Sequence, residues 1–412
     1  MNVAFGELIE FAIGGGWGEE QPSLGMVPVH VIRGADFPAA ESRNLASAPL
    51  RFEPAQRAVS RFLREGDIVL EISGGTKERP TGRSIYVSPQ LLASVPGHVI
   101  PASFCRLLRV DRSKAWPAFV YYALRDLYAR GGTWEFQNQS TGIANFQFEI
   151  FRERWRLDLP PLAEQQAIAE VLGALDDKIA ANTALAERLL AYINALFLRR
   201  FGERSLDTEL GILAEVVDCL HSKKPQRTDE GRPLMQLNNI RDDGLVDRVP
   251  EYRVSNFDYA QWSKKFETRP WDLVITNVGR IGAVARVPSG YEVAIGRNMT
   301  GIRPRDFTES GSFLAAALHS AAVRGEIERR TDSGSVMNAL NVRSIPLLRL
   351  QGSTADERRA FHQVAASFFE YADLALTENR SLAATRDALL PQLMSGKMRV
   401  RDAHDPAATA GA

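Results

Sequence analysis

The chain has 412 residues, enough for two or three domains that each bury a core of their own. Apolar residues make up 45% and charged residues 24%, which is ordinary for a folded protein and excludes a largely disordered one. Basic and acidic residues balance at 50 each, so composition neither supports nor excludes DNA binding, which would need charge gathered on one face.

No run of roughly 18 apolar residues occurs, so we expect no membrane span. Residues 1–7 lack a basic segment followed by an apolar one, and we expect no signal peptide. Cys105 and Cys219 are the two cysteines and suggest no disulfide framework. These features predict a cytoplasmic protein.

The first part of the chain, residues 1–158, mixes short alternating segments with glycine-rich turns. Residues 27–32 and 67–72 have the pattern of strands, and residues 118–129 that of a helix. The same mixture of short alternating segments and glycine-rich turns returns between residues 206 and 348. Prolines at 160–161 and at 346 mark the ends of these two regions, since proline favours the start of a helix.

The sequence is an internal duplication. FGELIE at 5–10 recurs as LGILAE at 210–215, and GDIVL at 66–70 recurs as WDLVI at 271–275. STGIAN at 140–145 recurs loosely as SGSVMN at 333–338, and NTAL at 182–185 as NRSL at 379–382. A repeat of about 200 residues is too long for a solenoid unit, so two homologous half-proteins are predicted.

Residues 164–201 have the heptad pattern of a coiled-coil helix. Two apolar series spaced by seven form the expected seam: Ile168, Leu175, Asn182, Leu189 and Leu196, with Leu172, Ile179, Ala186 and Ile193. The second copy gives Ala365, Ala372, Asn379 and Leu393, with Phe369, Leu376, Ala383 and Leu390, and Arg386 breaks the seam. A buried asparagine costs stability but fixes register. The alternative is that each helix packs on its own domain as a core element.

Two strings carry a resemblance to a known family. LPPLAEQQAIA at 159–169, continued by LDDKI at 175–179, resembles the central conserved region of specificity (S) subunits of type I restriction–modification systems. LLPQLMSGK at 389–397 resembles the end of their distal conserved region. The resemblance covers roughly residues 5–400, and it departs from the family pattern at 354–359, where the distal helix opens without the proline and glutamines.

The resemblance implies an α+β protein in which two mixed α/β target recognition domains are joined by two long antiparallel coiled-coil helices, related by a pseudo-twofold repeat. The implied parts are a first target recognition domain at 1–158, a central conserved helix at 159–204, a second target recognition domain at 205–348, a distal conserved helix at 349–400 and a flexible tail at 401–412.

Motifs for enzymatic chemistry are absent from the sequence. The glycine run at 14–18 lacks the lysine of a phosphate-binding loop. The prolines at 160–161 lack the preceding Asp or Asn and the following aromatic residue of a base-methylating enzyme. Histidines are scattered, and no Cys/His spacing suits zinc. We therefore expect no catalytic, cofactor-binding or metal-binding residues in this chain.

The main DNA-binding candidate is the loop after the strand at 67–72, because hydroxyls, backbone N–H groups and cations together suit phosphates and base edges. Its residues are Ser73, Gly74, Gly75, Thr76, Lys77, Arg79, Thr81 and Arg83, and its counterparts are Asn277, Gly279 and Arg280. Further candidates are Gln137, Asn138, Ser140, Thr141, His221, Lys223, Lys224, Asn238, Asn239, Arg297 and Asn298. The alternative for each is an ordinary solvated side chain.

The resemblance implies a non-catalytic subunit that recognises a bipartite target in double-stranded DNA. Its implied partners are two methyltransferase subunits, which would bind S-adenosylmethionine for DNA methylation, and restriction/translocase subunits, which would use ATP and Mg²⁺; no membrane is involved. The alternative is a two-headed coiled-coil scaffold that binds proteins rather than DNA.

Overall fold

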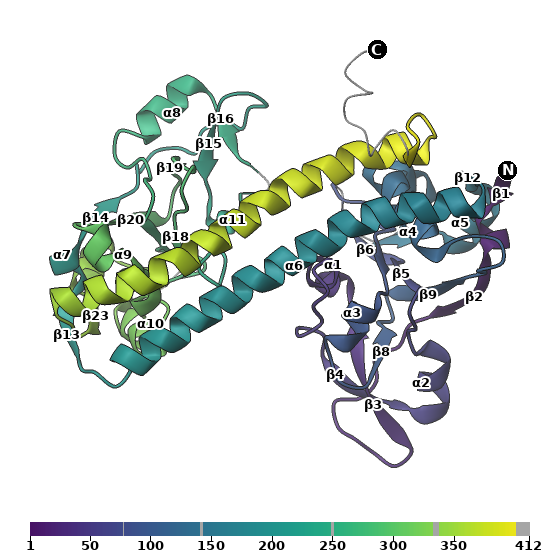
Figure 1. Ribbon diagram of the computed structural model, residues 1–412, viewed down its shortest axis with the longest axis horizontal. Helices are drawn as coiled ribbons and strands as arrows, with labels where there is room; N and C mark the ends of the chain where they lie inside the picture. Colours follow the sequence, from purple (N-terminus) through teal and green to yellow (C-terminus); the bar gives the residue numbers. More distant parts are fainter. Residues whose placement is uncertain (77, 141–142, 249–250, 333–337, 401–412) are drawn as a thin grey trace. The chain divides into compact units, whose positions relative to one another are not determined.

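The structure is a computed structural model that describes residues 1–76, 78–140, 143–248, 251–332 and 338–400. It forms two compact units: unit 1 consists of Met1–Thr183 and Glu378–Ala412, and unit 2 of Ala184–Thr377 (Figure 1). Each unit mixes helices and sheets, so the mixed α/β fold is confirmed. The predicted tail at 401–412 lies outside the described residues.

Unit 1 is built on four sheets. The largest is antiparallel, in the order β2 (Ile9–Gly14), β9 (Cys105–Val110), β5 (Ile68–Glu71) and β7 (Ser84–Tyr86). A mixed sheet has the order β4 (Leu50–Pro54), β3 (Met26–Ile32) and β8 (His98–Pro101), with β3 and β8 parallel. The smaller sheets join β10 (Gln137–Ser140), β11 (Ile143–Phe146) and β6 (Ser73–Gly75), and β1 (Asn2–Ala4) with β12 (Arg156–Asp158).

Unit 2 repeats this topology. Its antiparallel sheet has the order β14 (Ala214–Asp218), β20 (Met299–Pro304), β17 (Leu273–Thr276) and β18 (Val284–Arg286). Its mixed sheet joins β16 (Arg253–Val254), β15 (Arg232–Met235) and β19 (Ala294–Ile295), with β15 and β19 parallel. The small sheets pair β21 (Thr331–Asp332) with β22 (Ala339–Leu340) and β13 (Leu206–Glu209) with β23 (Arg349–Gln351). The predicted duplication is thus present in the two larger sheets, while the small sheet that includes β6 in unit 1 pairs β21 with β22 alone among the described strands of unit 2.

Short helices connect and cover these sheets. In unit 1 they are α1 (Phe37–Glu41), α2 (Ala55–Arg61), α3 (Pro89–Ala93), α4 (Pro117–Ala129) and α5 (Phe148–Arg154), with 3-10 turns η1 (Phe5–Leu8), η2 (Gly34–Asp36) and η3 (Gly132–Phe136). In unit 2 they are α7 (Leu210–Leu213), α8 (Asn256–Trp262), α9 (Phe307–Ala317) and α10 (Ala321–Arg329), with η4 (Leu237–Asn239) and η5 (Val342–Leu347). The strand predicted at 27–32 is β3 and the helix predicted at 118–129 is α4.

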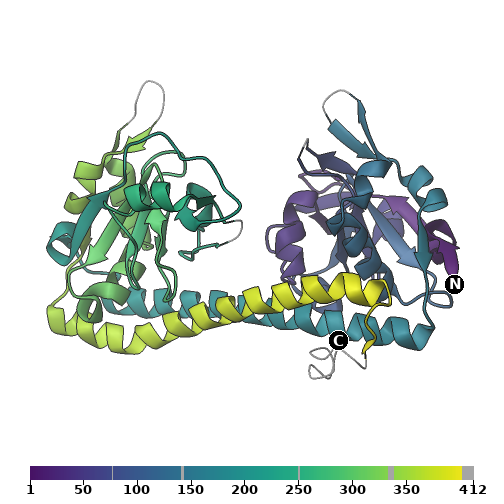
Figure 2. The same cartoon turned by 90° about the horizontal axis from the view of Figure 1, so that it is seen from above.

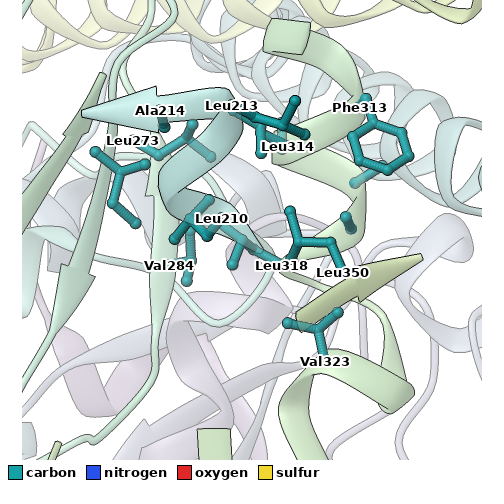
Figure 3. Packing of buried hydrophobic residues seen from close by; sticks show 14 of the residues in the cluster. Leu210, Leu213, Ala214, Leu273, Val284, Phe313, Leu314, Leu318, Val323 and Leu350 are labelled. Atoms are coloured by element: carbon teal, nitrogen blue, oxygen red, sulfur yellow. The ribbon is translucent and has the colours of Figure 1, made fainter. Parts of the chain in front are cut away.

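The core of unit 2 lies between its antiparallel sheet and these helices. Phe313, Leu314 and Leu318 from α9 and its end meet Leu273 of β17 and further apolar side chains, as Figure 3 shows. The other labelled members of this cluster are Leu210, Leu213, Ala214, Val284, Val323 and Leu350. Burying such side chains contributes about 1.5–3 kcal/mol each.

An identical ion pair fixes the antiparallel sheet of each unit. Asp67 accepts hydrogen bonds from Nε and Nη2 of Arg109, both at 2.7 Å. Asp272 accepts from Nε of Arg303 at 2.9 Å and from Nη2 at 2.6 Å. Both aspartates are almost fully buried. The two motifs predicted to correspond, at 66–70 and 271–275, therefore correspond in structure.

Two 40-residue helices, α6 (Leu162–Phe201) and α11 (Ala355–Met394), run side by side in opposite directions (Figure 1). In unit 1, Asn182 Nδ2 donates to Glu378 Oε2 at 2.7 Å, and Asn379 Nδ2 donates to Thr183 Oγ1 at 3.0 Å. In unit 2, the Tyr192 ring meets Phe368 edge-on at 5.2 Å. The two asparagines thus pair with the facing helix through polar contacts.

The predicted seam residues line this pairing to different depths. Those that are buried are Ile168, Leu172, Asn182, Ala186, Ile193, Ala365, Phe369, Ala372, Leu390 and Leu393. Those that are partly buried are Leu175, Ile179, Leu189, Leu196, Leu376, Asn379 and Ala383. Near the end of α6, Leu190 and Phe197 are buried beside the seam residue Ile193. They follow the predicted seam positions Leu189 and Leu196 by one residue, because a straight helix drifts about 20° per heptad.

Both interpretations of the helices are therefore partly right. Ile168 and Leu172 of α6, with Leu390 and Leu393 of α11, belong to the core of unit 1 as well as to the helix pair. Arg386, expected to break the seam, instead donates to Asp176 Oδ1 at 2.7 Å. Among the described helices, none combines the length and apolar character that a membrane span requires.

Candidate nucleic-acid interface

The predicted loop after β5 is organised by a buried carboxylate. Glu71 is 2% exposed and accepts from Arg83 Nε at 2.9 Å and Arg83 Nη2 at 2.5 Å, and from Arg79 Nη1 at 3.3 Å. Burial alone would lower the pKa of Arg83, but the hydrogen bonds and charge of Glu71 raise it above its ordinary value. The two arginines of the loop are therefore charged and already paired.

Other predicted residues of unit 1 hold this loop in place. Thr81 is fully buried, and its backbone N–H and hydroxyl both donate to Gln137 Oε1, at 3.0 and 3.3 Å. The segment Ser73–Gly75 is strand β6, which pairs with β11, and Thr76 accepts from the N–H groups of residues 78 and 79. Asn138 is exposed on β10. The β10–β11 hairpin lies on the side of unit 1 away from α6 and α11, as does β21–β22 in unit 2 (Figure 2).

Three further predicted positions are Lys77, Ser140 and Thr141. Lys77 and Thr141 lie outside the described residues, as does most of the recurring motif at 333–338. Ser140 belongs to β10 by its backbone pairing with Ile143.

In unit 2, three predicted residues support the frame. Asn277 is buried; its Nδ2 donates to Leu340 O at 3.0 Å, and its Oδ1 accepts from Thr300 Oγ1 at 2.9 Å. Asn239 is buried, and its Nδ2 donates to Asp247 O at 2.8 Å. Arg280 donates to Ile240 O at 2.7 Å and pairs with Asp242, beside Gly279 at φ +84°. These side chains use their polar groups inside the domain.

A cavity of about 750 Å3 opens at the carboxyl ends of the parallel strands β3 and β8 in unit 1. Ligand sites in mixed sheets favour such strand ends. The residues that line it and bear on its chemistry are Trp17, Arg33, Glu71, Arg79, Arg83 and Phe104. Trp17 and Phe104 are 41% and 66% exposed, so two large aromatic side chains face solvent at its rim.

Unit 2 has a cavity of about 570 Å3 at the equivalent place, the carboxyl ends of β15 and β19. Its lining includes Lys224, Arg227, Gln236, Asn238, Tyr252, Trp262, Arg297 and Asn298. The turns that follow β3 and β15 have the same cap: Arg33 N donates to Asp36 Oδ2 at 2.9 Å, and Gln236 N donates to Asn239 Oδ1 at 2.7 Å. The two cavities therefore occupy equivalent positions in the repeat.

Their electrostatics differ. In unit 1, Arg33 is paired in a bidentate manner with buried Asp36 at 2.8 Å, and Arg79 and Arg83 are paired with Glu71. In unit 2, the side chains of Lys224, Arg227 and Arg297 are exposed, and none has a carboxylate partner within the described ranges of the chain. The carboxylate in that lining, Glu251, is paired with Arg253. The second cavity thus carries cations without carboxylate partners among the described residues, whereas the three arginines of the first share two carboxylates.

The predicted residues His221 and Lys223 lie on the loop that follows β14. Both are exposed, and His221 Nε2 is 2.6 Å from Asp218 Oδ2. Asp218, Cys219 and His221 bring possible metal-ligand atoms within 4.8 Å of one another, a grouping that the sequence spacing did not suggest. Burial raises the pKa of the Cys219 thiol, which disfavours the thiolate that binds metals.

Of the predicted candidates, the structure gathers Ser73, Gly74, Arg79 and Arg83 at the first cavity and Lys224, Asn238, Arg297 and Asn298 at the second. The sequence analysis missed Trp17, Arg33, Phe104, Arg227, Tyr252 and Trp262. Trp17, Arg33 and Phe104 are brought together by pairings between segments far apart in the chain, and such pairings leave no local pattern. The glycines before Trp17 were the one available signal.

Comparisons with known proteins agree with this fold. Residues 64–191 match the type I restriction modification DNA specificity domain. The S subunit of the type I system of M. genitalium is similar in fold, with a TM-score of 0.56, 16% identity and 95% of each chain covered. HsdS of Thermoanaerobacter tengcongensis aligns with a TM-score of 0.35 and 16% identity over 97% of each chain. No curated protein sequence matches the chain significantly.

The match at 64–191 begins just before β5 and ends within α6, so it contains the Glu71 loop, α4, the β10–β11 hairpin and the central string. The resemblance stated from residues 159–169 is confirmed by a match that includes that string. Residues 64–191 match the type I restriction modification DNA specificity domain, and the chain as a whole is similar in fold to a type I restriction–modification S subunit.

Proposed function

We propose that this chain is the DNA specificity subunit of a type I restriction–modification complex, and that units 1 and 2 each recognise one half of a bipartite duplex target. The observation that carries the proposal is the pair of equivalent cavities, built on one frame and lined by different side chains. A protein that reads two different half-sites needs such an arrangement, because the shared frame positions each unit on the DNA and the loops determine which bases it recognises.

The helices would set the distance between the half-sites. A 40-residue helix such as α6 is about 60 Å long. Since one turn of B-DNA covers about 34 Å in roughly 10 bp, the centres of the half-sites should lie no more than roughly 17 bp apart.

Methyltransferase subunits would bind the exposed side of the helix pair. In unit 2 the two helices carry six exposed large apolar residues, here called the helix patch: Leu185, Tyr192, Leu198, Val364, Tyr371 and Leu374. Exposed apolar groups gathered on one element favour a protein interface. The partner would bind S-adenosylmethionine and rotate the target base out of the duplex, and restriction subunits would supply ATP- and Mg²⁺-dependent chemistry. This chain would itself be non-catalytic.

The proposal is tested by producing the chain together with its cognate methyltransferase and mapping methylated bases in the host DNA by sequencing. We expect a two-part motif with a fixed gap. A continuous motif would contradict the proposal.

A sharper test changes the length of both helices. Deleting residues 183–186 with residues 375–378 removes matched segments of α6 and α11. About 6 Å of helix is lost, so the gap should shorten by about 2 bp while both half-sites stay the same. Deleting residues 183–186 alone is the control, because it shortens α6 but not α11, so that Asp176–Arg386 and Tyr192–Phe368 can no longer both form, and it should abolish assembly.

A scaffold that binds proteins is the second candidate, favoured by the aromatic rim of the unit 1 cavity, whose arginines are already paired with carboxylates. Gel shifts of the assembled complex at several salt concentrations separate the two, because phosphate contacts make DNA affinity salt-dependent. DNA affinity that does not depend on salt would favour the scaffold. Methyl transfer by the purified chain alone would point instead to a self-sufficient enzyme.

A further inference from the structure

We propose that the two equivalent cavities are where each unit reads bases, and that they read by different physical means. Unit 2 would use free cations and amides, and unit 1 would use the aromatic faces of Trp17 and Phe104. This inference rests on the proposed function and adds to it the residues that specify each half-site.

The two reading positions correspond residue for residue. The backbone O of Phe104, just after β8, accepts from Ile72 N at 2.9 Å. The backbone O of Asn298, just after β19, accepts from Asn277 N at 2.8 Å. The donor in each case lies at the end of the central strand, β5 or β17, so Phe104 and Asn298 project from the same point of the frame.

In unit 2 this point carries hydrogen-bonding groups. Asn298 has φ +62°, a left-handed conformation that asparagine tolerates better than most residues. The Asn277 side chain, bonded to Leu340 and Thr300, fixes the backbone that holds it. Arg297 beside it and Asn238 opposite are exposed. Asparagine suits the N6/N7 edge of adenine and arginine the O6/N7 edge of guanine.

In unit 1 the same point carries an apolar group. Arg33, Arg79 and Arg83 already donate to Asp36 and Glu71, so all three are paired inside the unit and two of their three positive charges are offset. Phe104 and Trp17 are the large side chains left exposed at the rim. Aromatic side chains contact the thymine methyl group or insert between base steps without needing a hydrogen bond.

This difference predicts that salt acts on the two units unequally. Each cation that neutralises a phosphate adds about 0.9 to the slope of log affinity against log salt. Lys224, Arg227 and Arg297 are exposed and without a carboxylate partner in the described part of the chain, so unit 2 would carry most of the salt dependence. Unit 1 would contribute affinity that salt changes little.

The test uses the full chain in complex with its cognate methyltransferase and a pool of 40-bp duplexes of random sequence. Arg297→Ala and Asn298→Gly alter unit 2; glycine keeps the positive φ and removes only the amide. Trp17→Ala and Phe104→Ala alter unit 1. Matched controls are Arg349→Ala, an exposed arginine on β23, and Phe257→Ala, an exposed phenylalanine on α8.

We expect each pair of variants to relax one half of the selected motif, roughly 10- to 100-fold in discrimination, and to leave the other half intact. Removing Lys224, Arg227 and Arg297 should lower the salt slope by about 0.9 per side chain. Trp17→Ala and Phe104→Ala should weaken binding with the slope unchanged.

The possible failures are distinguishable. If the unaltered complex selects no bipartite motif, the proposed function itself is wrong. If it selects one and the cavity variants, shown to be folded by thermal melting, keep both half-sites, only the inference is overturned. Loss of both half-sites from variants of one unit, or equal salt slopes after removal of the three cations, would also overturn it.

Discussion

Units 1 and 2 share a frame and differ in what they place on it. The frame is repeated where backbone hydrogen bonds and a buried ion pair determine it: the strand orders of the two larger sheets match, and Asp67–Arg109 recurs as Asp272–Arg303. The ends of the strands differ, with Phe104 in one unit and Asn298 in the other. Exposed strand ends tolerate such changes because no backbone bond or packing depends on the side chain.

The helix pair shows the same contrast. In unit 2 it carries the helix patch, whereas the exposed positions of α6 in unit 1 are mostly small, polar or charged, such as Gln166, Glu170 and Lys178. Yet each unit anchors a helix aspartate on an arginine of its own globular part: Asp176 on Arg125, and Asp373 on Arg286 at 2.7 Å. The aspartate–arginine contact, which both units share, stabilises the structure, whereas the exposed side chains, in which the units differ, face solvent.

The largest expected effects come from removing these anchors. Asp176→Ala removes the carboxylate that Arg125 and Arg386 share, which leaves Arg125 without a carboxylate partner, Arg386 with only Asp387, and Tyr122 Oη without its acceptor. Removing one partner of a buried pair costs about 3–5 kcal/mol. Asp373→Ala should cost about 3 kcal/mol of unfolding free energy, because it leaves one buried arginine, Arg286, without its carboxylate partner. Urea unfolding of each variant measures both values.

Asp177→Ala is the matched control, because Asp177 is 56% exposed and its pair with Arg43 should contribute at most about 1 kcal/mol. The triple change Asp176→Leu, Arg125→Leu and Arg386→Leu should recover most of the loss, since apolar replacement of a complete buried group of charges is often neutral. If Asp176→Ala and Asp177→Ala cost the same, the anchor is not what stabilises unit 1.

The duplicated ion pair should contribute equally in both units. Asp67→Ala and Asp272→Ala each remove a bidentate partner of a partly exposed arginine, so we expect a loss of roughly 2–3 kcal/mol for each. Hydrogen exchange resolved by peptide should place each loss in the unit that carries the change. An effect in one unit alone would show that the two ion pairs have the same geometry but contribute differently to the free energy of unfolding.

Unit 2 should also lose stability at mildly acidic pH. Burial, with the charge of Arg324, lowers the pKa of His319 to about 4. Between pH 6.5 and 4 the unfolded imidazole binds a proton that the folded one does not, so stability is lost as pH falls. This group should account for about 2 kcal/mol between pH 7 and pH 5.

His319→Gln removes this titration, and the difference in unfolding free energy between pH 7 and pH 5 should shrink accordingly. His98→Gln, an exposed histidine of unit 1 stacked on Phe62, is the control and should leave it unchanged. An unchanged pH dependence in the His319 variant would contradict the prediction.

The smallest effect on stability should come from the helix patch. Leu185→Ser and Leu374→Ser change exposed side chains and should alter the free energy of unfolding by no more than about 0.5 kcal/mol. Co-purification of the methyltransferase should nevertheless drop sharply if the patch is its binding surface. Glu170→Ser on the polar side in unit 1 is the control, and equal retention by all three variants would place the interface elsewhere.

Much of the frame could be predicted from sequence because it is written in local or repeated patterns. The periodicities of the β3 segment and of α4, the heptads of α6 and the matched motifs before β5 and β17 all correspond to observed elements. Asn182 was expected in the helix seam, and it is buried there with Glu378 as its partner. Periodicity and internal repetition can be recognised in a sequence without knowledge of which distant residues are in contact.

The cavities could be predicted only in part. The sequence suggested cations after β5, but Arg79 and Arg83 turned out to be held by Glu71, a residue whose burial no local pattern reveals. Phe104 reaches one rim because β8, which ends just before it, pairs in parallel with β3, and Trp17 reaches it because Gly16 bridges to Ala102, in both cases across a long stretch of chain. Arg386 was taken as a fault in the seam because its partner, Asp176, lies in the other copy.

The paired helices also constrain how this chain can change over generations. Asp176–Arg386 and Asn182–Glu378 are two successive polar contacts between α6 and α11 within unit 1. An insertion between them in one helix alone would leave one contact intact and slide the other out of reach. The lengths of α6 and α11 can therefore change only together, through equal insertions at two sites far apart in the gene. A loop at a strand end, by contrast, can change with a single substitution.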